Sequence, residues 1–165
     1  MAMASREDEL RVTLSLWEKL SEEAPGRRGQ PSLVLTATVQ ELRESVGRHL
    51  EFLINARHGE EDFDSEFEEC HKSVLAYGVI DFTTIVLSNS AEREGLRRSI
   101  ERSVQQFEPR LSRVRVTMDE WDSSQRGLTL HIAAHMRVEP ENEPVAFSAV
   151  LAKDTRRFAV SGGRG

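Results

Sequence analysis

The chain has 165 residues, of which 38% are hydrophobic and 30% charged, with a formal net charge of −6 and one cysteine. This length suits a domain with a substantial core, and the acidic balance argues against a nucleic-acid binder, which would present a basic surface. No apolar run approaches the ~20 residues needed to span a bilayer, and Met1–Glu9 lack the apolar stretch of a secretory signal. The single Cys70 fits a reducing compartment, so we expect a cytoplasmic protein.

The first thirty residues are expected to form a short helix and a linker ahead of the main domain. Residues 10–20 carry a helical stripe, although the apolar residues at positions 10, 12, 14 and 16 also alternate as in a strand. Ala24–Pro31 then breaks the chain with proline and glycine. We therefore divide the chain into residues 1–30 and a single domain over residues 31–165. The stripe consists of Leu10, Leu14, Trp17 and Leu20.

A long amphipathic helix is predicted from Ser32 onward, because apolar residues recur at steps of three and four over about five turns. The helix is expected to end within Asn55–Gly59, where cations and a glycine suit the helix dipole and a left-handed cap. Such a helix needs a large surface to pack on. The apolar face consists of Leu35, Val39, Leu42, Val46, Leu50 and Leu53.

Residues 59–69 are expected to form an acidic loop that carries seven carboxylates. Asp62, Asp64 and Glu66 stand at alternate positions, as calcium ligands do. An EF-hand loop also needs glycine at its sixth position and a bidentate acid at its twelfth. Phe67 and Ser73 occupy those positions, so the sequence favours a solvated loop over a calcium site.

A packed irregular connection with a tight Tyr-Gly turn is predicted over Ser73–Phe82, followed by a second helix. Asn89, with Glu92 three residues later, indicates the start of this helix through a capping box. Pro109 cannot continue a helix, so Glu108 should be its last residue or the first beyond it. The buried face of the second helix is expected to hold Leu96, Ile100, Val104 and Phe107.

Beyond Pro109 the apolar period changes to two, which is typical of strands with one buried face. Four consecutive strands joined by short connections favour an antiparallel meander. The predicted fold class is α+β with two layers, in which long helices pack on one face of a four-strand meander. The inward positions are Val114, Val116 and Met118; then Leu128, Leu130, Ile132, Ala134, Met136 and Val138; then Val145, Phe147, Ala149 and Leu151; and last Phe158 and Val160.

Two pairs of residues invite a chemical interpretation that their geometry does not support. Cys70 and His71 are adjacent, and adjacent side chains rarely face each other as a nucleophile and its base. His131 and His135 would lie roughly 13 Å apart on a strand, too far to share one metal ion. We therefore read both histidines as exposed sheet residues.

Hydrolysis by a pair of carboxylates is a further alternative, because the chain carries 28 Asp and Glu residues. A glycosidase needs two carboxyls about 5 to 9.5 Å apart, one of them with a raised pKa. Nothing in the sequence selects such a pair. We expect no catalytic residue, no metal site and no cofactor.

Four segments in order resemble one family. Ser45–Arg57 resembles the S-V-x-R-D-L-E-x-L-L-N-T-R helix of the TssE family of type VI secretion baseplate subunits, which is related to phage contractile-tail baseplate wedge proteins. Ser73–Phe82 looks like the family's S-V-L-N-Y-G-x-x-D-F connection, and Glu108-Pro109-Arg110 matches its E-P-R motif. Glu139–Phe147 is similar to its E-P-x-x-E-P-V-x-F turn and strand. The chain departs from the family at His49 (usually Asp), Ala56 (Thr) and Ala76 (Asn).

The resemblance implies a structural role in a baseplate wedge, with the family's wedge partners TssF, TssG and TssK and the sheath subunits as binding partners. On this basis the expected partner-binding residues lie within the shared motifs. A charge pair held at a fixed angle by Pro109 suits docking to a partner, and Arg110→Ala is expected to leave the domain folded while blocking sheath assembly. Whether the pair contacts a wedge partner, the sheath or its own neighbours in the fold stays open. The candidate residues are Glu108, Pro109, Arg110, Asn55, Arg57, Tyr77 and Asp81.

Two alternatives to this role are kept. Related phage proteins have been labelled lysozymes, so one alternative is a peptidoglycan hydrolase. The other is the equivalent wedge protein of a tailocin or an extracellular contractile injection particle.

Overall fold

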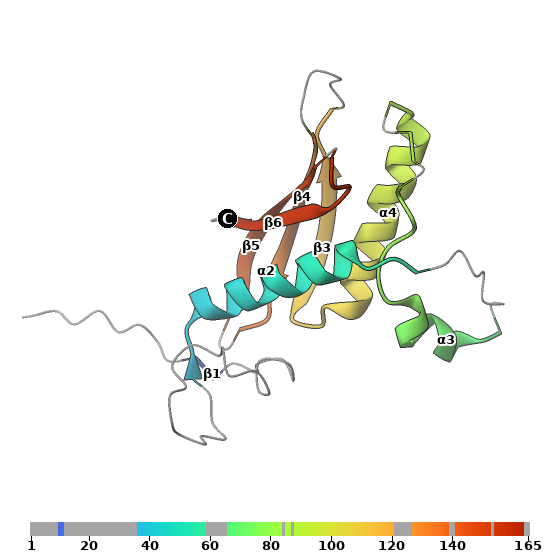
Figure 1. Ribbon diagram of the computed structural model, residues 1–165. Helices are drawn as coiled ribbons and strands as arrows, with labels where there is room; N and C mark the ends of the chain where they lie inside the picture. Colours follow the sequence, from blue (N-terminus) through green and yellow to red (C-terminus); the bar gives the residue numbers. More distant parts are fainter. Residues whose placement is uncertain are drawn as a thin grey trace, which may run out of the picture.

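A computed structural model of the chain describes residues 10–11, 36–58, 66–83, 85–86, 88–120, 127–138, 141–152 and 154–163. It shows a mixed fold of helices and a four-stranded antiparallel sheet, which confirms the predicted α+β class (Figure 1). None of the helices in these ranges is long and apolar enough to cross a membrane. The elements are β1 (Leu10–Arg11), β2 (Thr36–Ala37), α2 (Val39–Asn55), α3 (Glu68–Lys72), the 3-10 turn η1 (Val74–Ala76), α4 (Ser90–Phe107), β3 (Leu111–Met118), β4 (Gly127–Met136), β5 (Glu143–Ala152) and β6 (Phe158–Gly163).

The sheet follows chain order, β3-β4-β5-β6, with every neighbouring pair antiparallel. Alternate residues are buried, as the period of two predicted. The register shifts between Ser112 and Arg115, where Arg113 adopts a positive φ of 52°. This bulge lets Leu111 and Val114, three positions apart, both face the core.

Helix α2 begins at Val39 and not at Ser32, so the predicted start is wrong. The cause is a capping box: the Thr38 hydroxyl accepts from the Glu41 backbone N–H at 3.2 Å, and the Glu41 carboxylate accepts from the Thr38 N–H at 2.8 Å. Thr36–Ala37 pair with β1 instead, while residues 32–35 lie outside the described residues. The apolar period alone could not show where the first turn is capped.

Three further expectations near these elements change. Leu10–Arg11 form β1, so the predicted first helix does not start there, and residues 12–20 lie outside the described part of the chain. Helix α2 ends at Asn55 with Ala56 extended (φ −75°), not with a left-handed glycine cap. The predicted acidic loop 59–69 ends earlier, because Glu68 and Glu69 form the first turn of α3, where carboxylates suit the helix dipole. Residues 59–65 of that loop are outside the described ranges.

Helix α4 matches its prediction closely. The Asn89 side chain accepts from the Ala91 N–H at 3.0 Å, and the chain leaves the helix at Glu108. The predicted capping box is replaced by a variant in which the Glu92 carboxylate accepts from the Asn89 amide and the Val86 N–H.

One core joins the two helices to the buried face of the sheet. Helix α2 crosses near β5 and β6, and α4 runs alongside β3 (Figure 1). Tyr77, Ile80 and Phe107 pack against the edge of this core. The largest fully buried side chains are Phe82, Phe147, Leu42, Leu50, Leu53, Ile54, Leu96, Ile100, Leu128, Leu130, Ile132 and Met136.

The connection after η1 returns to α2 through Gly78, which has a φ of +116°. Val79 donates to the Ala56 carbonyl at 2.9 Å, and a Cβ at position 78 would lie 2.5 Å from the oxygen of that carbonyl. Both the backbone angle and the contact therefore require glycine. This is the tight Tyr-Gly turn that the sequence indicated.

We predict that Gly78→Ala lowers the free energy of unfolding, because an alanine at this backbone angle is strained and its Cβ would collide with the Ala56 carbonyl that accepts from Val79. Urea unfolding followed by circular dichroism measures the change. The matched control is Gly95→Ala, on an exposed position of α4 where an added Cβ meets no atom within 4 Å. That control should gain up to about 1 kcal/mol through helix propensity. Equal effects of the two substitutions would contradict the strain argument.

Candidate functional site

A carboxylate with no exposed surface lies where α4 meets β3. Glu108 follows the last residue of α4, and its side chain is 0% exposed. Its N–H donates to the Val104 carbonyl at 3.0 Å, and its carbonyl accepts from Leu111 at 3.1 Å. Together with Pro109, these two backbone bonds form a tight corner between α4 and β3, and the Glu108 carboxylate points into the protein.

Arg110 pairs with this carboxylate through both arms of its guanidinium. Nε donates to Glu108 Oε1 at 2.8 Å and an Nη donates to Oε2 at 2.7 Å, while the other Nη reaches Ser45 Oγ on α2 at 2.7 Å. The Arg110 side chain is 15% exposed. A two-point arginine–carboxylate pair is geometrically specific and strong, so the corner is fixed to α2 by charge-assisted hydrogen bonds.

His49, one turn after Ser45 on α2, completes the cluster. Its Nδ1 lies 2.6 Å from Glu108 Oε2, and its Nε2 lies 3.3 Å from the Tyr77 hydroxyl. Tyr77 also packs edge-on against Phe107, with ring centroids 5.3 Å apart. An ionised Glu108 can only accept, so His49 carries its proton on Nδ1 and donates to the carboxylate. The cluster, defined here as Ser45, His49, Tyr77, Glu108 and Arg110, thus joins α2, α4, β3 and the Tyr77 connection.

The electrostatics of Glu108 result from two opposed effects. Burial penalises the charged form and so raises the pKa of Glu108. Hydrogen bonds from Arg110 and His49 lower this pKa by a larger amount, so its net value is about 2 against an ordinary 4.5. Burial and the nearby Glu108 charge raise the pKa of Tyr77. Glu108 is therefore ionised at neutral pH. A general acid for glycoside hydrolysis needs the opposite shift, so Glu108 is unsuited to that role.

A second group of the predicted residues lies at the end of α2. Asn55 bonds both backbone groups of Phe158, donating to its carbonyl at 2.8 Å and accepting from its N–H at 2.9 Å. Arg57 lies 4.6 Å over the Phe82 ring and 3.4 Å from Asp81. The pKa of Asp81 is lowered, chiefly by the Thr83 backbone N–H. Asn55 thus closes β6 onto α2, while Arg57 and Asp81 remain partly exposed.

The structure therefore separates the predicted partner-binding residues into two groups and gives most of them partners inside the chain. The sequence left open whether Glu108 and Arg110 contact a wedge partner, the sheath or neighbours in their own fold. The structure contains contacts of the last kind, since the two residues bind each other and Arg110 binds Ser45. Sequence reasoning noted His49 only as a departure from the family and did not include Ser45. Their four-residue spacing beside the buried face of α2 was the signal that could have found them.

The outer edge of β3 is closed by side chains of α4. Glu101 accepts from the Val116 N–H at 2.8 Å, Arg97 donates to the Val116 carbonyl at 3.1 Å, and Gln105 donates to the Val114 carbonyl at 3.3 Å. These bonds occupy the groups that a further strand would need.

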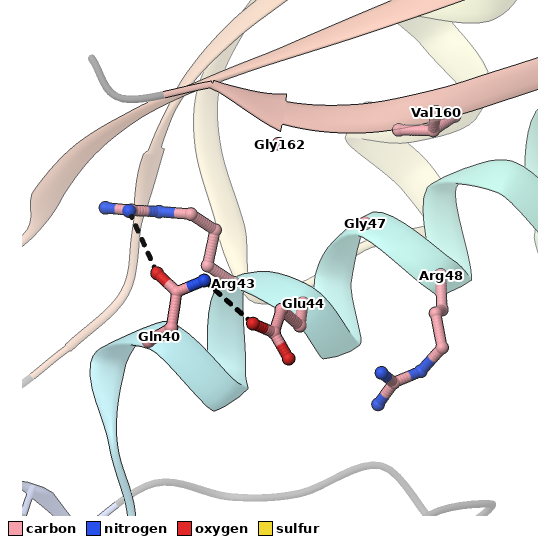
Figure 2. A pocket seen from close by; sticks show the side chains of 7 residues that line it. All are labelled: Gln40, Arg43, Glu44, Gly47, Arg48, Val160 and Gly162. Carbon is pink, nitrogen blue, oxygen red and sulfur yellow. Dashed lines mark hydrogen bonds between the residues drawn. The ribbon is translucent and has the colours of Figure 1, made fainter.

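The outer edge of β6 is closed only over its first half. Asn55 binds Phe158, and Glu51 accepts from the Val160 N–H at 2.9 Å. Gly162, two residues on, shares the outward direction by the strand period and has no such side-chain bond among the described residues. Beside it lies a groove of about 790 Å³ between α2 and β6 (Figure 2). Its lining consists of Gln40, Arg43, Glu44, Gly47, Arg48, Val160 and Gly162.

Comparison with known proteins gave one family match. A family model described as "Baseplate wedge protein gp25" matches residues 40–141. Neither the curated proteins nor the solved structures gave a match. The matched span begins one residue into α2 and runs past β4, so it contains every member of the cluster.

We predict that Arg110→Ala lowers the free energy of unfolding by about 3–5 kcal/mol, because it leaves a buried carboxylate without its main partner. The sequence-based expectation was that this variant leaves the domain folded, and the internal contacts of Arg110 now add a predicted loss of stability to it. Urea unfolding at pH 7 measures the loss. Arg98→Ala, which breaks the exposed 2.7 Å pair with Glu94, is the matched control and should change little. Similar losses in both variants would contradict the special weight given to the cluster.

We also predict a pH dependence that Glu108 controls. Its folded-state pKa of about 2 lies below its ordinary value of 4.5, so its stabilisation is complete above that ordinary value and is lost as the pH falls from about 4.5 toward 2. The shift corresponds to ~3 kcal/mol. Unfolding free energies of wild type and Glu108→Gln, measured from pH 7 to pH 3, should converge as the pH falls. Parallel curves would refute this assignment.

Proposed function

Because this chain belongs to the baseplate wedge protein gp25 family, a structural family of phage tail-like baseplates, we propose that it is a baseplate wedge subunit of a type VI secretion system. In this role it joins the other wedge proteins, TssF, TssG and TssK, and helps to initiate or anchor assembly of the contractile sheath. The assembly would lie at the cytoplasmic side of the inner membrane. The role is structural and not enzymatic.

The observation that carries this proposal is the family match, which spans the whole corner at Glu108-Pro109-Arg110. The corner supports a scaffolding role, because a subunit that links several partners must keep its surfaces at fixed angles. Glu108, Pro109, Arg110, Asn55 and Tyr77 act in this proposal as positioning residues inside the wedge. Arg57 and Asp81, which keep exposed surface, make direct contact with a partner.

The sheet offers a mechanism for attachment. Strand addition to an open edge gives main-chain hydrogen bonds without a deep pocket. The bonds from α4 disfavour the β3 edge, and the bonds from Asn55 and Glu51 disfavour the first half of β6. The region of Gly162 beside the α2 groove is therefore the edge that we propose accepts a strand from a sheath subunit.

We infer the following domain arrangement for this role. Residues 31–165 form a single wedge domain with two layers, in which the long helices cover one sheet face. Residues 1–30 precede it as a short segment and linker. The covered face supplies rigidity, and the Gly162 end of the β6 edge and the opposite face are left for partners.

We predict that Gly162→Pro blocks sheath assembly while the domain stays folded, because proline removes an outward N–H near the end of an edge strand. Gly162→Ala is the matched control: it keeps the N–H, and its Cβ would make ordinary contacts with Arg43 and Phe147 at 3.8–4.0 Å. Fluorescent sheath subunits in cells that lack the native chain and carry each variant report assembly.

Two results would contradict the proposal. One is sheath assembly with Gly162→Pro at the wild-type level, which would exclude strand addition at this edge. The other is failure of the wild-type chain to co-purify with any wedge protein, which would exclude the wedge role itself. Peptidoglycan digestion by the purified chain would instead favour the hydrolase alternative.

A further inference from the structure

The segment Glu66–Ala76 forms regular structure without contributing to the core. Neither α3 nor η1 contains a buried residue. Yet the segment carries three large apolar side chains that are mostly exposed, at 57% for Phe67, 81% for Val74 and 59% for Leu75. Exposed apolar side chains grouped in one short segment are typical of an interaction site.

The segment is too short to be stable by its own helical bonds. Helix α3 has five residues, whereas isolated helices shorter than about 12–15 residues are marginal in water. Ser73 links the two turns, since its hydroxyl donates to the Cys70 carbonyl at 2.8 Å and accepts from the Leu75 N–H at 3.2 Å. The Gln106 amide ties α3 to α4 through the His71 carbonyl. These polar ties hold the shape while leaving the apolar side chains outward.

The surface around these side chains is acidic. Glu66, Glu68 and Glu69 are all exposed, and Lys72 is the only lysine or arginine in the segment. Lys72 lies 3.4 Å from Glu68 and 3.6 Å from Glu69, so one cation serves two carboxylates. The sequence leading into the segment adds more carboxylates at Glu60, Glu61, Asp62 and Asp64. A partner of complementary charge would therefore be basic around an apolar centre.

The far end of the segment is fixed to the rigid part of the molecule. Tyr77 follows η1 directly, packs against Phe107 and hydrogen-bonds His49 of the cluster. The end of the segment is thus in direct contact with the cluster that contains Glu108. This makes the segment a suitable contact for a load-bearing assembly.

We propose that the α3–η1 surface, formed by Phe67, Val74 and Leu75 with a rim of Glu66, Glu68 and Glu69, docks an amphipathic segment of another wedge protein. That segment presents apolar side chains flanked by lysine or arginine. The identity of the occupant as a wedge protein rests on the proposed function. Its chemistry rests on the exposed apolar side chains and the acidic rim.

The first test is site-specific photo-crosslinking in cells that assemble the baseplate. A photoreactive phenylalanine analogue in place of Val74 should crosslink to a wedge-protein peptide that contains apolar residues flanked by basic ones. The same analogue in place of Val86, an exposed valine outside the segment at 55%, is the matched control and should not capture that peptide. Capture of an acidic peptide, a lipid or a second copy of this chain at position 74 would overturn the proposal, as would capture of no product.

The second test compares Val74→Asp/Leu75→Asp with Val86→Asp by co-purification with the wedge proteins. Both variants should keep the wild-type melting temperature, because these side chains lie outside the core. The Val74→Asp/Leu75→Asp variant should recover at least tenfold less wedge protein than wild type, while Val86→Asp should match wild type. The charge reversal Glu68→Lys/Glu69→Lys should also reduce recovery. Undiminished recovery by Val74→Asp/Leu75→Asp overturns this proposal alone. Failure of the wild-type chain to recover any wedge protein overturns the proposed function and this proposal together.

Discussion

The buried ion pair between Glu108 and Arg110 is the interaction on which the rest of the structure depends. Removing a carboxylate from water is costly, and the pair is favourable only because both Glu108 oxygens receive short, well-directed hydrogen bonds. The donors are Arg110, which directly precedes β3, and His49 on α2, while the carboxylate itself follows α4. The geometry that satisfies the charge therefore also fixes how these elements meet. A different helix angle would leave a buried charge unsatisfied.

The two helices fixed in this way bond the two edges of the sheet to different extents. At one edge, α4 lies close enough to β3 for Arg97, Glu101 and Gln105 to bind its outer backbone groups. At the other edge, the hydrogen bonds from Asn55 and Glu51 of α2 occupy backbone groups in the first half of β6, and among the described residues no such side-chain bond is made to Gly162. The two helices thus protect the sheet unequally, and the unprotected part lies beside the α2 groove. For the strand addition that we propose, this asymmetry leaves the Gly162 end of β6 as the accepting edge.

His49 and the α3–η1 segment connect the rigid interior with the surface. His49 stands at the position where the motif that Ser45–Arg57 resembles has aspartate. With histidine, the same position supplies a donor to Glu108 and a partner to Tyr77. Tyr77 in turn anchors η1, whose Val74 and Leu75 face outward. One partly buried network is therefore continuous with the segment that we propose docks a wedge partner.

Local pattern alone was enough for much of this fold. The apolar periods predicted α4, most of α2, the four strands and their buried faces, because hydrophobic burial repeats with the geometry of each element. Pro109 marked the end of α4, since proline cannot continue a helix. The start of α2 at Val39 and the short helix at Glu68 were missed, because caps and single turns leave weak periodic signals. What only the tertiary structure decided is the role of the charges. Glu108 was predicted as a docking charge, yet it is buried by partners that include His49, 59 residues away in sequence. No local pattern specifies such a contact, because the cost of burying a charge depends on donors that folding alone brings together.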